Sequence, residues 1–141
     1  MSIKSMGVMT LAALSLIAGA VLARTPSPEG AGVYIISPAD GAVVESPVTV
    51  TFGLKGMGVA PAGIDKANTG HHHLLIDLKE TPAVDAPLPT DANHRHFGGG
   101  QTQVAVELRP GEHTLQLILG DMSHISHDPP VTSKKISIVV K

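Results

Sequence analysis

The sequence predicts an all-β protein, and three observations support this prediction. Apolar and polar residues alternate in several separate stretches, which is the period of a strand with one buried face. Helical periodicity is nearly absent from residue 33 onward. The 15 glycines and 11 prolines of the 141-residue chain supply turns between short segments. Because each strand would have one apolar face, we expect two packed antiparallel sheets in an immunoglobulin-like β-sandwich.

The expected strands follow one another with turn residues between them. They cover residues 33–36, 48–54, 72–78, 102–108, 113–119 and 136–140. A tight turn at 109–112 contains Pro110 and Gly111 and predicts a hairpin between the strands that flank it. The stretch 79–100 contains several prolines, which exclude a central strand. Long loops of this kind are often functional.

Residues 1–23 have the features of a signal peptide. Lys4 supplies a positive charge, an apolar stretch follows, and Val21-Leu22-Ala23 places small residues at the positions that a signal peptidase reads. We expect cleavage after Ala23, or alternatively after Ala20. The apolar stretch is shorter than the roughly 20 residues of a membrane span, so no stable membrane anchor is expected after cleavage. The expected location is the periplasm, or otherwise the exterior of the cell.

The rest of the chain is expected to form one domain. Residues 24–32 are rich in proline and glycine and predict a flexible linker, and residues 33–141 predict the sandwich. No cysteine is present, which excludes disulfides and lipid attachment through cysteine. A formal net charge of −2, with one Tyr and two Phe, argues against nucleic acid as a partner.

Histidine is the residue type that points to chemistry, because seven of the eight histidines fall in three tight groups at 71–73, 94–96 and 124–127. Imidazole is the commonest protein ligand for transition metals. The expected strand directions bring all three groups to one end of the sandwich. His113 lies at the other end beside the 109–112 turn, where we expect a structural hydrogen bond to the backbone.

These groups predict a site for a divalent metal ion, Cu(II) or Zn(II), in a monomeric or weakly associating protein. Residues two apart in a strand point the same way, so His71 and His73 share the polar face while His72 points toward the core. Three or four ligands would bind at once. Neutral imidazoles should release the ion below about pH 6, because protons compete for the same lone pairs. The candidate ligands are His71, His73, His94, His96, His124 and His127.

Two other functions remain open. The protein could be a structural or interaction module that binds a protein or cell-wall partner, with its histidines tying long loops together by hydrogen bonds. A hydrolytic enzyme is a weaker alternative, because no pair of nucleophile and base is evident. The only carboxylates near the groups are Asp91, Asp121 and Asp128. We therefore expect a protein that is not an enzyme.

Four motifs in order along the chain resemble those of a bacterial family labelled domain of unknown function 4399, whose members are small exported proteins. The motifs are GHHHLLID (70–77), NHRHFGGGQT (93–102), PGEHTLQL (110–117) and GDMSHISHDPP (120–130). The resemblance covers roughly residues 33–141. It implies an immunoglobulin-like β-fold and export from the cytoplasm, and it implies no particular activity.

Overall fold

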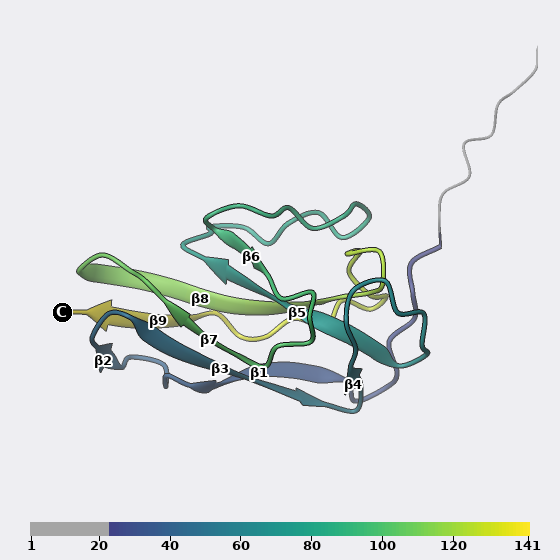
Figure 1. Cartoon of the computed structure of the whole chain (residues 1–141), viewed down its shortest axis with the longest axis horizontal. Coiled ribbons are helices and arrows are strands. Elements are labelled where there is room, and N and C mark those ends of the chain that lie inside the picture. Colours follow the sequence, from purple (N-terminus) through teal and green to yellow (C-terminus); the bar gives the residue numbers. More distant parts are fainter. Residues whose placement is uncertain (1–22) are drawn as a thin grey trace, which may run out of the picture.

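In the computed structural model, which describes residues 23–141, the chain forms nine strands, and six of them lie in the alternating segments (Figure 1). No helix in this part of the chain is long and apolar enough to cross a membrane. The predicted signal peptide lies outside the described residues except for Ala23. The strands are β1 (Gly32–Ser37), β2 (Val43–Val44), β3 (Val48–Lys55), β4 (Gly58–Val59), β5 (Thr69–Ile76), β6 (His94–His96), β7 (Gln103–Val106), β8 (Gly111–Gly120) and β9 (Ile136–Val140).

The strands form two sheets. The smaller sheet has the order β1-β3-β7, and the larger has the order β2-β9-β8-β5-β4, with β6 paired to β5. All the long strands pair antiparallel, and only the two-residue strands β2 and β4 add parallel pairs. The predicted all-β antiparallel sandwich is confirmed.

The core lies between the two sheets. From the larger sheet, Leu74 of β5 and Leu115 and Leu117 of β8 point inward, and from the smaller sheet Val50 and Phe52 of β3 meet them. All five side chains are buried. Their spacing of two along each strand is the alternation seen in the sequence. The opposite face of the larger sheet is therefore free for other residues.

The predicted hairpin at 109–112 is wrong. β7 pairs with β3 of the smaller sheet, whereas β8 pairs with β5 and β9 of the larger one. The turn thus connects the two sheets. The hairpin prediction failed because a turn sequence specifies a reversal of direction and not which neighbour each strand will pair with. β8 still runs antiparallel to β5, so that Gly120 lies opposite His71, at the end of the sheet predicted for the histidines.

The stretch 79–100 contains no central strand, as expected from its prolines, but it ends in the short edge strand β6. β6 follows the last proline of this stretch and pairs antiparallel with β5 (Figure 1). The rest of the stretch packs Leu88 against Leu75 and Ile118, on the outer face of the larger sheet. This loop therefore covers part of the face that carries His71 and His73.

Residues 24–32, which we expected to be a flexible linker, lie against the loop that follows β8 (Figure 1). The backbone N–H of Ser27 donates to the carbonyl of Asp128 at 3.0 Å, and the N–H of Asp128 donates to that of Thr25 at 2.9 Å. The proline and glycine content of this segment predicted flexibility. Its docking could not be recognised from composition, because the partners lie about 100 residues away in the sequence. β1 then begins at Gly32.

Candidate metal centre

Three histidines are brought together by strand pairing in the larger sheet. Alternation along β5 places His71 and His73 on its outer face, whereas His72 points into the core, as predicted. β6 pairs with β5 so that His96 lies directly opposite His73. Directly paired residues of an antiparallel pair project to the same side of the sheet. His96 therefore joins His71 and His73 on the outer face.

The fourth histidine comes from the loop after β8, and Asp121 shapes this loop. One carboxylate oxygen of Asp121, Oδ1, accepts hydrogen bonds from the backbone N–H groups of Ser123 at 2.9 Å and Ile125 at 3.0 Å. Burial alone would raise the pKa of Asp121, but these bonds and one from Thr25 lower it, so the side chain stays ionised. His124 at the tip has a φ of 65°, in the left-handed region. The loop thus turns back over the outer face of the sheet.

The four imidazoles of His71, His73, His96 and His124 converge on one point. Each offers one ring nitrogen, and these four nitrogens all lie within 4.8 Å of one another. His71 Nε2 is 3.0 Å from His73 Nε2 and 3.1 Å from His124 Nδ1. Nitrogens bound to a single Zn²⁺ at about 2.0–2.1 Å would lie at comparable separations. The arrangement could hold a metal ion.

Two glycines leave room for these rings. A Cβ atom on Gly120 would lie 2.8 Å from His73 Nε2, and one on Gly98 would collide with the ring of His96. Neither glycine has a positive φ, so their backbone conformation does not require glycine. What requires it is the close approach of the imidazoles.

Burial lowers the pKa values of three of the four imidazoles. His71 and His73 are at most 1 % exposed, and burial, together with the neighbouring imidazoles of the cluster, lowers their pKa values to about 4 and about 3. Burial and the nearby His124 also lower the pKa of His96. A neutral imidazole has one ring nitrogen with a free lone pair, which is the form that binds metals.

The cluster cannot satisfy its own hydrogen bonds. His71 Nε2 carries either one proton or one lone pair, yet it faces two other nitrogens within 3.1 Å. It can form a full hydrogen bond with only one of them. His96 Nε2 is also buried without a partner. Buried polar groups normally have partners, and a cation at the centre would accept the converging lone pairs.

Two of the six candidate ligands lie outside this cluster. His94 Nδ1 donates to the carboxylate of Asp91 at 2.8 Å, and His127 Nε2 donates to the backbone carbonyl of Thr69 at 3.1 Å. These contacts connect loops to their neighbours, which is the scaffolding role considered for all the histidines. Each of the three sequence groups thus contributes at least one member to the cluster.

His72 is buried in the core, where its ring packs against Phe52 with centroids 5.1 Å apart. Burial lowers its pKa to about 4, which the nearby backbone of Gln101 opposes only in part, and neither ring nitrogen makes a hydrogen bond of normal geometry. An unsatisfied buried polar group costs about 1–3 kcal/mol. We expect His72→Phe to raise the free energy of unfolding at pH 7 by about 1 kcal/mol, measured by urea denaturation. Metal binding should be unchanged, since His72 faces away from the cluster; a destabilised variant would contradict this account.

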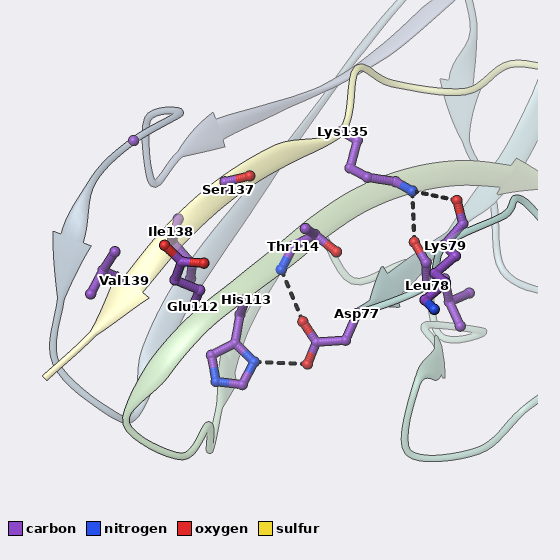
Figure 2. A pocket seen from close by; sticks show the side chains of 11 residues that line it. Asp77, Leu78, Lys79, Glu112, His113, Thr114, Lys135, Ser137, Ile138 and Val139 are labelled. Carbon is purple, nitrogen blue, oxygen red and sulfur yellow. Dashed lines mark hydrogen bonds and ion pairs between the residues drawn. The ribbon is translucent and has the colours of Figure 1, made fainter.

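His113 has the structural role predicted for it. Its Nε2 donates to the carbonyl of Arg109 at 2.8 Å. Its Nδ1 donates to the Asp77 carboxylate at 2.7 Å (Figure 2). Burial would lower the pKa of His113, but Asp77 and the Arg109 carbonyl outweigh it and raise the pKa. Both ring nitrogens are therefore engaged.

His113 lines a groove of about 700 Å³ at the end of the sheet away from the cluster. Two of its polar side chains bond to protein: the Lys135 ammonium donates to the carbonyls of Leu78 and Lys79, and Asp77 also accepts the N–H of Thr114 (Figure 2).

Fold and site together define an all-β protein with a buried histidine cluster that could hold a metal ion. Residues 50–141 match the family model described as "Domain of unknown function (DUF4399)". The chain belongs to this family, which confirms the resemblance carried by its motifs. The matched region runs from β3 to the end of β9 and includes all four histidines of the cluster. Searches of curated proteins and of solved structures found no match.

Proposed function

We propose that the protein is an exported metal-binding module that holds one Cu(II) or Zn(II) ion between His71, His73, His96 and His124. The observation that carries the proposal is the convergence of four ring nitrogens within 4.8 Å, two of them on fully or nearly fully buried side chains with strongly lowered pKa values. Without an ion, such a cluster lowers the free energy of unfolding, because its buried ring nitrogens carry too few protons to form all the hydrogen bonds between them.

The donor set restricts the choice of metal. All four donors are imidazole nitrogens, which suit Zn²⁺ and Cu²⁺, while Mg²⁺ and Ca²⁺ prefer oxygen and Cu⁺ prefers sulfur. Four protein ligands fill a tetrahedral shell, whereas catalytic zinc sites keep a position for water or substrate. The geometry therefore favours storage or delivery of the ion over catalysis.

Calorimetric titration of the purified protein tests this proposal. At pH 7 we expect one equivalent of Cu(II) or Zn(II) to bind with micromolar or tighter affinity, and Mg(II) to give no heat of binding. Neither heat nor a shift in melting temperature with Cu(II) and Zn(II) would overturn the proposal.

Two neighbouring pairs of histidines give matched variants for the same titration. His96→Ala should weaken binding by at least about 100-fold, because it removes a ligand. Loss of a group that only hydrogen-bonds to a ligand already lowers metal affinity by about 10–100-fold. His94→Ala, two residues away in β6, should bind normally. His124→Ala and His127→Ala should differ in the same way, since His127 Nε2 bonds to a backbone carbonyl instead. Equal losses within either pair would contradict the assignment.

Export is supported by the character of residues 1–23, with a charged start, an apolar stretch and small residues before Arg24. Expression in a Gram-negative host followed by periplasmic extraction and mass spectrometry provides the test. We expect a periplasmic protein that begins at Arg24, or alternatively at Val21. A cytoplasmic protein of full mass would contradict export.

A further inference from the structure

The four candidate ligands differ in how firmly they are held. His71 and His73 belong to β5, which pairs with β8 on one side and with β6 on the other, and His96 belongs to β6 itself. His124 alone lies in a loop. Removing a strand residue from the cluster would require breaking the sheet, so the site can open most easily by moving His124.

The N-terminal segment 24–27, which we call the N-terminal strap, holds the start of this loop. The hydroxyl of Thr25 donates to Asp121 Oδ2 at 2.7 Å. Asp121 is the residue whose other oxygen fixes the loop through Ser123 and Ile125, and its carbonyl accepts the N–H of His124 at 2.9 Å. The strap thus contacts the residue that positions His124.

The strap also holds the end of the loop. The Arg24 guanidinium donates to the carbonyls of Ser126, at 3.1 Å, and of His127, and it lies 3.5 Å from the Asp128 carboxylate. The backbone pairing of Pro26 with Asp128 adds to these contacts. Arg24 and Thr25 together therefore hold both sides of the turn that carries His124.

The outer surroundings of the cluster are consistent with an ion that exchanges. Metal-ligating histidines usually donate their second N–H to a protein or water acceptor, which strengthens binding by about 10–100-fold. The Nδ1 atoms of His71 and His73 are buried and have no protein acceptor. Because this support is missing at His71 and His73, the residence time of a bound ion depends more strongly on the position of His124.

We propose, on the basis of the proposed function, that the N-terminal strap controls the exchange of the metal ion. With the strap docked, His124 completes a closed shell of four imidazoles. When the strap is released, the bond between the ion and His124 Nδ1 breaks and the lone pair stays on that nitrogen. The three sheet histidines retain the ion, and a donor atom of an acceptor protein or chelator occupies the open position. No electron is transferred and no proton is required.

Release of Zn(II) to a chromophoric chelator tests this inference, with the exported protein purified in each variant. Thr25→Val removes a hydrogen bond to a charged carboxylate, so release should accelerate about tenfold or more. Thr25→Ser should restore the slow rate, because it keeps the hydroxyl. Thr49→Val, on an exposed position of β3, is the matched control and should release Zn(II) at the rate of the original protein.

A spectroscopic signature separates control of the ligand from general loosening of the fold. The visible absorption of bound Co(II) should change in Thr25→Val and Arg24→Gln toward that of His124→Ala, and it should be unchanged in Thr49→Val. Absence of metal binding in the original protein would overturn the proposed function. Normal binding with equal release rates and equal spectra in the strap variants would overturn this inference alone.

Discussion

Lowering the pH from 7 to 5 is expected to remove a large part of the stability of the metal-free protein. The pKa values of His71 and His72 are lowered to about 4 and that of His73 to about 3, mainly by burial. In the unfolded chain these groups would titrate near 6.5. Between these values the unfolded state binds more protons than the folded state, so stability is present above pH 6.5 and is lost as the pH falls.

The expected loss is large compared with the stability of ordinary domains. One pKa unit corresponds to about 1.4 kcal/mol, so each of these three histidines contributes about 2 kcal/mol of loss by pH 5 and the three together on the order of 6 kcal/mol. Small domains have only about 5–15 kcal/mol in total. Urea denaturation of the metal-free protein across this pH range measures the effect. A free energy of unfolding that stays constant between pH 7 and pH 5 would contradict the burial of the cluster.

A bound ion should counteract this acid sensitivity. Ion binding to the folded state adds about 2.7 kcal/mol at a free concentration 100 times the dissociation constant. Because the pKa values of His71, His73 and His96 are lowered, protons compete with the ion only at lower pH than they would for exposed imidazoles. The site should therefore keep its ion somewhat below pH 6, the value expected from unperturbed histidines. The same denaturation series with Zn(II) present measures this protection.

Gly120→Ala is expected to abolish tight metal binding although it changes no ligand. The new methyl group would lie 2.8 Å from His73 Nε2 and 3.5 Å from the Cα atom of His124, so the ring of His73 or the loop must move. Metal sites depend on ligand geometry, and we expect the affinity to fall by at least about 100-fold, comparable to the loss of a ligand. Calorimetric titration with Zn(II) provides the measurement.

Gly58→Ala is the matched control for this variant. It adds the same methyl group to strand β4 of the same sheet, where the nearest side-chain atom, Thr69 Cγ2, is 3.6 Å away. Neither glycine has a positive φ, so backbone strain does not differ between them. Gly58→Ala should bind Zn(II) normally. If Gly120→Ala also bound normally, the ion would not lie beside His73.

Much of the fold could be predicted from the sequence because strand alternation is a local signal. The stretches containing Val50, Leu74 and Leu117 alternate over several residues, and each forms a strand with those residues buried. Strand pairing was less accessible. The 109–112 turn has hairpin residues, yet it connects two sheets, because pairing is decided by packing over the whole domain. The docking of residues 24–27 on the 121–128 loop is equally non-local.

Part of the candidate site could be predicted for the same reason. The spacing of His71 and His73 placed them correctly on one face, and strand direction placed all three groups at the same end. The sequence could not separate His96 from His94 or His124 from His127, because that depends on the register of β6 and on the turn built by Asp121. Gly98 and Gly120 lie near histidine groups in the sequence, which was the available sign that they belong to the site. That they make room for imidazoles can be seen only in the folded structure.

X-ray absorption spectroscopy of the Zn(II)-loaded protein tests most directly whether these four histidines surround one ion. We predict a first shell of four nitrogens at about 2.0–2.1 Å, with the outer-shell scattering of four imidazole rings, and a loss of one ring in His124→Ala. A shell with two or fewer imidazoles, completed by oxygen, would contradict the account.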